Sequence, residues 1–284
     1  MESILTYEDF VSINEKLITF GGKPYPNFNQ VVIIAGGGGS GKGFQLSNLV
    51  GIEGKVMNVD DFKTLVLKSK KVVKNIKDET GYDISKFELG KNPDDVGRLH
   101  DILKNVYPLV DANKRNVFKS ILLADKNRKP NLIFDVTLKE IKKFFSIVRT
   151  SKDIGYKTEN IHLVWVIDTV GAALKKNRRP DRGRIVPEDI LIQTHEGASL
   201  TMRRIMEKGS DLQKYMDGDI WFSFNKINVD TDLEKSEFGG SYIKDADYVQ
   251  LKKKGQQQLG VDDMNQKLLN KIRKYTPKID KWAK

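Results

Sequence analysis

The chain has 284 residues, of which 39% are hydrophobic and 31% charged, and it carries a net charge of +11. This composition is typical of a globular protein with one large domain or two small ones. Because the chain has no cysteine and three histidines, it can form no disulfide, thiolate metal site or cysteine nucleophile, and a histidine-rich zinc centre is disfavoured. The positive charge suits polyanionic partners such as nucleotides or nucleic acid, although a lysine-rich solvated surface explains it equally well.

The first residues of the chain give no indication of a leader or a membrane anchor. The stretch MESILTYEDF has early acidic residues, and no apolar run in the chain approaches the ~20 residues that cross a bilayer. We therefore expect a cytoplasmic protein without a membrane partner. Thr6, Asp9 and the apolar residues up to Ile18 predict a capped amphipathic helix in an N-terminal extension, residues 1–30.

Several short apolar runs predict a parallel sheet. Val31 to Ala35 is an unbroken, mostly β-branched run, which is typical of a strand buried on both faces. Further strands are predicted at 55–59, 131–134 and 161–167, and they end at Asp60-Asp61, Asp135 and Asp168. Because parallel strands end at one shared edge, where α/β proteins bind their ligands, we expect these carboxylates to gather there.

The segment between the second and third of these strands is too long for a simple crossover. Residues 62–130 show helical periodicity, which predicts a helical insert over the ligand-binding edge. Two helices are expected at 60–73 and 138–148. We expect a core at 31–210 and a C-terminal extension at 211–284, with strands at 220–224 and 248–251 and a helix at about 262–275. The expected fold class is α/β, a parallel sheet flanked by helices, with this helical insert and a C-terminal extension.

A glycine-rich motif follows the first predicted strand and precedes a helix that runs to about Val50. It satisfies G-x-x-x-x-G-K, the pattern of a phosphate-binding loop. Backbone N–H groups of such a loop surround phosphate oxygens, and Lys42 would contact the β and γ phosphates of ATP or GTP. The predicted nucleotide-binding residues are Gly36, Gly37, Gly38, Gly39, Ser40, Gly41, Lys42 and Gly43.

One position departs from this motif, because Gly43 stands where a Ser or Thr hydroxyl normally ligates Mg²⁺. Another group must then complete the metal shell, or the metal site is weak. The candidates are Ser40, Asp60 and Asp135, acting directly or through water.

The acidic residues after the strands have two interpretations. Asp60 or Asp61 could be the base that accepts a proton from a hydroxyl during phosphoryl transfer, or both could cap the helix that follows. Asp135, followed by Thr137, could likewise serve the site or cap the helix expected at 138–148.

A basic segment follows the strand at 161–167 and a helix. Pro180, Gly183 and Pro187 keep part of it out of a helix. In a chain with a phosphate loop, it predicts a mobile lid whose arginines stabilise the transferring phosphoryl group, and the alternative is a solvated basic loop or a nucleic-acid patch. Its basic residues are Lys175, Lys176, Arg178, Arg179, Arg182 and Arg184. Among the histidines, His195 is expected to pack or to lie on a helix surface, and His100 and His162 are expected far from any motif.

The ordered motifs resemble those of the zeta-toxin-like P-loop kinases, over about residues 31–206. After the phosphate loop, that family has Asp-x-Phe-Arg, here Asp60-Asp61-Phe62-Lys63, and then Glu-Gly-Thr-Leu-Arg, here Asp135-Val136-Thr137-Leu138-Lys139. An arginine-rich lid and a helix near Ile-Pro, here Val186-Pro187, complete the pattern. The loop ending Gly-Lys-Gly-Phe also resembles proteins of large tailed bacteriophages, which would place the protein in the cytoplasm of a host cell.

This resemblance implies an ATP- or GTP-dependent, Mg²⁺-assisted kinase that phosphorylates a hydroxyl of a small molecule such as a nucleotide sugar, and an inhibitory protein partner. Asp60 would be the base, and Arg178, Arg179, Arg182 and Arg184 would belong to the lid. The substrate side would include Asp61, Lys63, Asp135 and Thr137, and Lys63, Asp135 and Val136 depart from the family pattern there. The alternatives are a polynucleotide or nucleoside kinase, favoured by the charge, and a nucleotide-binding module without turnover, favoured by Gly43.

Overall fold

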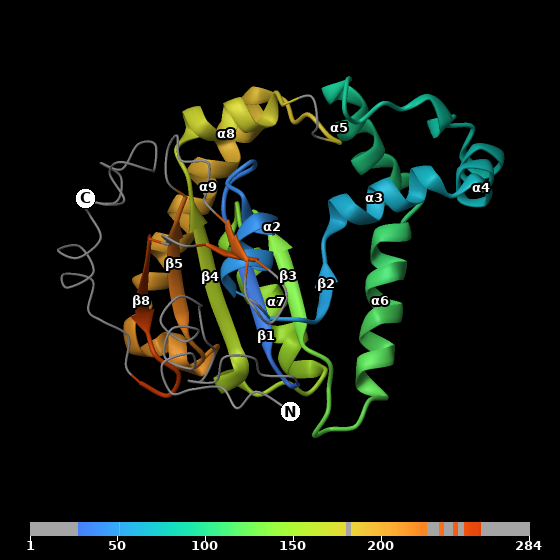
Figure 1. Cartoon of the computed structure of the whole chain (residues 1–284). Helices are drawn as coiled ribbons and strands as arrows, with labels where there is room; N and C mark the ends of the chain where they lie inside the picture. The colour runs from blue at the N-terminus through green and yellow to red at the C-terminus, as the bar shows by residue number, and fades with distance from the viewer. Residues whose placement is uncertain are drawn as a thin grey trace, which may run out of the picture.

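The computed structural model describes residues 28–50, 52–179, 183–225, 233–235, 241–243 and 247–256. The helices expected near residues 6–18 and 262–275 lie outside this part of the chain. A six-stranded sheet, ordered β2-β3-β1-β4-β5-β8, forms the centre of the molecule (Figure 1). Five strands run parallel, and β8 pairs antiparallel with β5. The strands are β1 (Val31–Ala35), β2 (Lys55–Met57), β3 (Leu132–Val136), β4 (Ile161–Ile167), β5 (Ile220–Phe224) and β8 (Asp247–Lys252).

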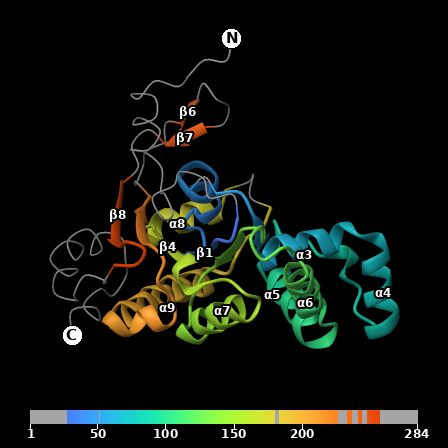
Figure 2. The same ribbon diagram turned by 90° about the horizontal axis from the view of Figure 1, so that it is seen from below.

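Both faces of β1 are covered, which explains its unbroken apolar sequence. Val31 and Ile33 belong to a core shared with α7 and α9, whereas Val32 and Ile34 pack toward the helix after the glycine loop. Figure 2 shows α7 and α9 together on one side of the sheet. The helices around the sheet are α2 (Lys42–Gln45), its continuation η1 (Leu46–Val50), α7 (Ile141–Asp153), α8 (Val170–Asn177) and α9 (Glu188–Met206). The molecule therefore has the expected α/β fold, with a sheet flanked by helices.

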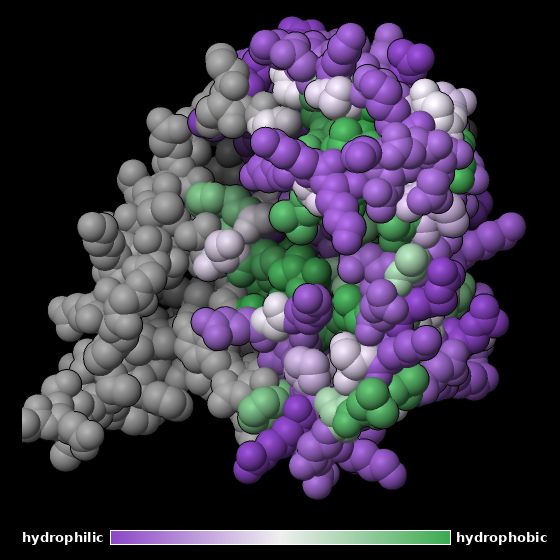
Figure 3. Space-filling model, turned by 90° about the vertical axis from the view of Figure 1, so that its right-hand side faces the viewer, coloured by the Kyte–Doolittle hydropathy of each residue, from purple (hydrophilic) through white to green (hydrophobic). Residues whose placement is uncertain are grey.

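The helical insert stands beside the short edge strand β2 (Figure 1). It has an apolar core of its own, built around Ile76, Ile84 and Leu99, so the interpretation of this segment as a helical unit is confirmed. Seen from this side, the surface is mainly hydrophilic, with hydrophobic side chains exposed between the charged ones (Figure 3). Its elements are α3 (Val59–Lys68), α4 (Lys70–Thr80), η2 (Ile84–Lys86), α5 (Pro93–Asp101), η3 (Ile102–Val106) and α6 (Leu109–Leu122).

Three expected boundaries were wrong for local reasons. The second strand ends at Met57 instead of residue 59, because Asn58 caps α3. The helix expected at 60–73 is divided at Ser69, whose hydroxyl accepts a hydrogen bond from the Val72 N–H and begins a second helix. The helix expected at 138–148 begins at residue 141, because Leu138 has a left-handed backbone with φ of 48° that no helix accommodates.

The central sheet continues past residue 210, the boundary expected for the core. The predicted strand at 220–224 is confirmed as β5, which pairs with β4, and the strand predicted at 248–251 is confirmed within β8. A separate two-stranded sheet is formed by β6 (Leu233–Lys235) and β7 (Ser241–Ile243). The short helices η4 (Thr158–Asn160) and η5 (Gly209–Lys214) precede β4 and β5. Within the ranges given above, no helix has the length and apolarity needed to span a membrane.

Candidate active site

The glycine motif forms the turn between β1 and α2, at the carboxyl edge of the sheet. Gly39 and Gly41 have φ values of 75° and 84°, in the left-handed region. A Cβ atom on Gly41 would lie 2.6 Å from the Asn225 Nδ2 atom. Glycine at residue 41 is therefore required by both backbone conformation and packing.

A buried polar cluster holds this loop from the side of β5. The Asn225 amide donates a hydrogen bond to the Ser40 carbonyl, and its Oδ1 atom accepts one of 2.5 Å from the Gln45 side chain. Gln45 in turn accepts a 2.9 Å hydrogen bond from the Ser223 hydroxyl. Sequence analysis missed this cluster, although Asn225 directly follows a predicted strand and could have been placed at the shared edge.

Lys42 lies across the loop. Its Nζ atom is 3.1 Å from the Gly36 carbonyl oxygen, 3.3 Å from that of Gly37 and 3.8 Å from Asp135 Oδ1. Since β1 pairs with β3 and Ile34 stands opposite Asp135, the expectation that Asp135 neighbours the phosphate loop is confirmed. The ammonium group is thus held where the motif requires it.

Asp135 is partly buried in β3 and does not cap α7, so the capping interpretation was wrong. Burial raises the pKa of Asp135; Lys42 lowers it, but the negative charges of Asp60 and Asp61 raise it again, and the net shift is upward. The Asn58 amide donates a 3.0 Å hydrogen bond to Asp135 Oδ2. Asn58 was missed by sequence analysis, and it joins β3 to the start of α3.

Asp60 and Asp61 lie in the first turn of α3, where the capping residue is Asn58. Its Oδ1 atom accepts hydrogen bonds of 2.8 Å from the Asp60 N–H and 3.4 Å from the Asp61 N–H. The two aspartates therefore occupy first-turn positions, as predicted, but the N-cap itself is Asn58. Asp61 is exposed.

The Asp60 carboxylate forms ion pairs with two cations. It contacts the Arg184 guanidinium, and the Lys63 Nζ atom lies 3.3 Å from it. Burial raises the pKa of Asp60, but the charges and hydrogen bonds of Arg184 and Lys63 outweigh it and lower the pKa. Lys63 is itself buried, which lowers the pKa of its ammonium group despite Asp60. The structure thus brings together Asp60, Lys63 and Arg184, which sequence analysis had placed in one site.

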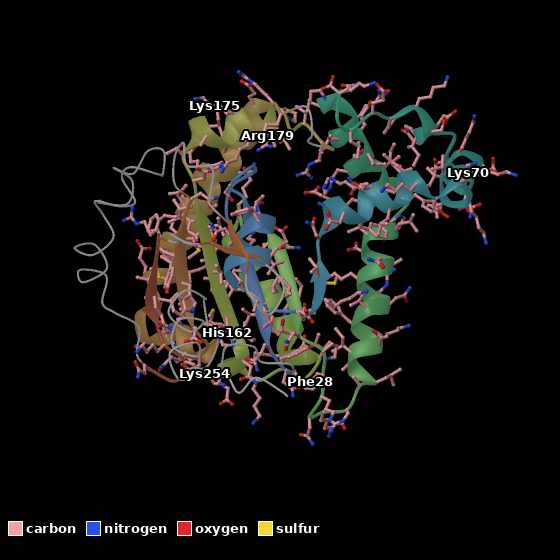
Figure 4. All side chains as sticks on the ribbon, in the orientation of Figure 1. Phe28, Lys70, His162, Lys175, Arg179 and Lys254 are labelled. Carbon is pink, nitrogen blue, oxygen red and sulfur yellow. The ribbon has the colours of Figure 1, made fainter. Side chains whose placement is uncertain are left out.

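The arginine segment follows α8 as expected and ends where α9 begins, directly after Pro187. Arg178 pairs with Glu188 at 2.7 Å, Arg179 is exposed, and Arg182 lies outside the described residues. In Figure 4, Lys175 and Arg179 lie at the end of the molecule that also carries the glycine loop.

The end of this segment is fixed on two sides. The buried Asn177 side chain donates a 2.7 Å hydrogen bond to the Val186 carbonyl and accepts one of 3.0 Å from the Val186 N–H. The Ile185 N–H donates a 2.9 Å hydrogen bond to the Leu89 carbonyl in the insert. Backbone next to Arg184 therefore connects α8 with the insert, a contact that sequence analysis missed.

Ser40 and Thr137 are the remaining residues that were predicted to bind metal or substrate. Ser40 is fully buried, and its hydroxyl oxygen has no hydrogen-bond partner among the described residues. A Cβ atom on Gly43 would meet nothing within 4 Å. Thr137 is half-buried in the loop after β3. Within the described part of the chain, no group of three or more His, Asp or Glu side chains could hold a metal ion.

The three histidines have different surroundings. His195 is buried and packs as expected, but its partner is the glycine loop. His100 was not expected close to any motif; burial and then the charge of Lys63 lower its pKa, and Asp60 acts on it in the opposite direction. His162 lies at the opposite end of the sheet from Arg179 (Figure 4).

No protein-family model and no curated protein matches the sequence. Among solved structures, similar chains occur in the AvrRxo1-ORF1:AvrRxo1-ORF2 complex with sulphate ions (13% identity, 85% of this chain, 63% of that chain, TM-score 0.48) and in that complex with ATP (13%, 85%, 64%, 0.45). A third belongs to the PezAT chromosomal toxin–antitoxin system of Streptococcus pneumoniae (13%, 76%, 72%, 0.37). The chain spans less than two thirds of the length of the two AvrRxo1-ORF1:ORF2 chains. At this identity the similarity concerns the course of the backbone.

Proposed function

We propose that the protein is a nucleotide-dependent kinase that transfers the γ-phosphate of ATP or GTP to a hydroxyl group. The observation that carries this proposal is the convergence of four distant segments at one edge of the sheet. Lys42 of the loop lies beside Asp135 of β3, and Asp60 of α3 lies beside Arg184 of the arginine segment. Asn58 joins the two pairs through its hydrogen bonds to Asp135 and to the Asp60 backbone.

The donor nucleotide fits the glycine loop. The Lys42 ammonium group donates hydrogen bonds to two loop carbonyls, which phosphate oxygens could replace as its partners. Residues 36–43 would thus bind the polyphosphate, and Lys42 would neutralise part of its charge during transfer.

Asp135 is the residue that would hold Mg²⁺, directly or through water, because its carboxylate lies next to Lys42 and is oriented by Asn58. The buried Ser40 hydroxyl is a weaker candidate, since no part of it reaches solvent. When bound, Mg²⁺ would neutralise charge on the phosphate oxygens.

Asp60 is the proposed base. It would accept the proton of the acceptor hydroxyl while that oxygen forms a bond to the γ-phosphorus and the bond from the γ-phosphorus to the β-phosphate oxygen breaks, leaving a nucleoside diphosphate. A carboxylate whose pKa is lowered is ionised at neutral pH, although the same ion pairs make it a weaker base until its partners move to the phosphate. Arg184 and the other lid arginines, Arg179 and Arg182, would stabilise the charge of the transferring group.

We further propose, from the zeta-toxin-like motifs, that the acceptor is a small molecule such as a nucleotide sugar, bound with the help of Asp61, Lys63 and Thr137, and that an inhibitory protein partner exists. The net charge of +11 favours a second candidate, a polynucleotide or nucleoside kinase. Binding of single-stranded oligonucleotide with a steep salt dependence would support that candidate.

The test is incubation with γ-labelled ATP and a metabolite extract, following where the label goes. Wild type should label a hydroxyl-bearing acceptor, whereas Lys42→Ala and Asp60→Asn should not. Lys74→Ala and Asp78→Asn, the same changes at exposed residues of α4, are matched controls and should label like wild type. ATP binding without transfer to any acceptor would leave a nucleotide-binding module instead of a kinase.

A further inference from the structure

Two consecutive residues of α9 hold both polar groups of a single residue in the glycine loop. The Gly38 N–H donates a 2.8 Å hydrogen bond to the Thr194 hydroxyl oxygen, and the His195 Nε2 atom lies 2.8 Å from the Gly38 carbonyl oxygen. The Thr194 hydroxyl donates its own hydrogen to the Leu191 carbonyl, at 2.7 Å, so its oxygen is the acceptor toward Gly38. Because a carbonyl only accepts, His195 Nε2 must carry a proton and donate it.

The His195 ring also lies directly against the loop. A Cβ atom on Gly37 would come within 2.2 Å of the ring, which is 5% exposed. The absence of a side chain at residue 37 therefore makes room for the histidine, in addition to any room that it makes for a phosphate.

The helix that provides these contacts also contacts other parts of the candidate site. It has 19 residues, begins directly after the arginine segment, and also contacts the loop after β3. There the Lys139 ammonium group donates a 3.1 Å hydrogen bond to the Gln193 side chain, and a Cβ atom on Gly197 would lie 2.7 Å from the Lys139 carbonyl oxygen. One helix thus contacts the nucleotide loop and the predicted substrate-side loop.

We propose that Thr194 and His195 are positioning residues that fix the glycine loop in its nucleotide-binding conformation before nucleotide arrives. The proposal rests on the proposed function, because it assigns to this loop the binding of a nucleotide polyphosphate. Fixing the backbone of one residue costs conformational entropy. If the two contacts already hold Gly38 in place in the free protein, nucleotide binding does not have to order this residue. Losing either contact should therefore weaken nucleotide binding about tenfold.

The test compares a variant that removes each hydrogen bond with one that retains it. His195→Leu and Thr194→Val remove the donor and the acceptor, whereas His195→Gln and Thr194→Ser retain them. Titration calorimetry with ATP should give a Kd about tenfold higher for the first pair and within about threefold of wild type for the second. In turnover assays KM should rise with little change in kcat, because neither side chain touches the reacting atoms.

A purely structural role would not produce this pattern. His162 is equally buried and hydrogen-bonded, but it lies at the far end of β4. His162→Gln should therefore lower the melting temperature and leave the Kd for ATP unchanged. As a measurement that needs no variant, the Gly38 amide of the nucleotide-free wild type should exchange its hydrogen slowly.

The possible failures are distinguishable. If wild type binds no ATP, or Lys42→Ala binds it as tightly as wild type, the proposed function fails. If Lys42→Ala loses binding but folded His195→Leu and Thr194→Val bind like wild type, the positioning role alone is refuted. Rapid exchange of the Gly38 amide in the nucleotide-free protein would refute it as well.

Discussion

Gly43→Thr restores the hydroxyl that the phosphate-loop motif normally offers to Mg²⁺. Residue 43 is the second residue of α2, and a Cβ atom there would meet nothing within 4 Å, so the added side chain enters open space. The Asp135 side chain lies more than 4 Å from the position of this Cβ atom. The change therefore tests the metal ligation without disturbing the rest of the site.

Two effects of different size are expected from this substitution. Gly is a poorer helix former than Thr by about 0.3–0.5 kcal/mol, so the variant should be slightly more stable. A hydrogen bond or ligand to a charged centre contributes roughly 1.5–3 kcal/mol, which corresponds to about 10-fold to 100-fold tighter nucleotide binding. The second effect should appear only when Mg²⁺ is present.

The assay is the Kd for ATP with and without Mg²⁺, together with the melting temperature, for wild type, Gly43→Thr, Gly43→Val and Asp135→Ala. Val has the shape of Thr without the hydroxyl and is therefore the matched control. The affinity of Gly43→Thr for ATP should rise when Mg²⁺ is present, and that of Gly43→Val should not. Asp135→Ala should lose the Mg²⁺ dependence of ATP binding that the wild type has. Equal behaviour of Thr and Val would refute metal ligation at residue 43, and wild-type affinity indifferent to Mg²⁺ with no detectable transfer would refute the kinase itself.

Three further predictions concern other residues. Lys42→Ala should weaken ATP binding by about 10-fold to 100-fold with the fold intact, because a charged contact to phosphate is lost; an unaltered Kd would mean that the nucleotide site is misplaced. Asp60→Asn should leave ATP affinity nearly unchanged and reduce turnover by roughly 10²-fold, and wild-type turnover would transfer the role of base to Asp61 or Asp135. His162 is buried, which lowers its pKa below 6.5 in spite of Asp219. Its contribution to stability should be present above pH 6.5 and lost as the pH falls below it, so the melting temperature should fall less steeply with acidification in His162→Gln than in wild type; identical slopes would contradict this.

The part of the site that the sequence predicted correctly is the part with local signals. The apolar run from Val31 to Ala35 followed by glycines predicted a buried strand and a tight loop. The structure has both, since the two faces of β1 are covered and two loop glycines have left-handed backbones. The position of Asp135 beside this loop followed from the rule that parallel strands end at one edge.

The contacts that could not be predicted depend on tertiary packing. In the sequence, His195 is an ordinary residue of an amphipathic helix. Only the packing of α9 against the loop brings its ring to Gly37 and Gly38. Asn58 is similar, since its capping role is local but its hydrogen bond to Asp135 depends on the pairing of β2 with β3. The pairing of Asp60 with Arg184 likewise requires the start of the insert to lie next to the segment that follows α8.

The order of the strands has a consequence for how the protein is made. β1 leaves the ribosome before both strands that pair with it, because β3 and β4 come about a hundred residues or more later along the chain. Pairings of such sequence separation form slowly, because a long segment must be closed into a loop first. The contact that holds Ser40 comes later still, from Asn225 at the end of β5. During synthesis the nucleotide motif is therefore among the first parts of the described chain to appear and among the last to take its shape, and a chain arrested before residue 225 carries the motif without the site.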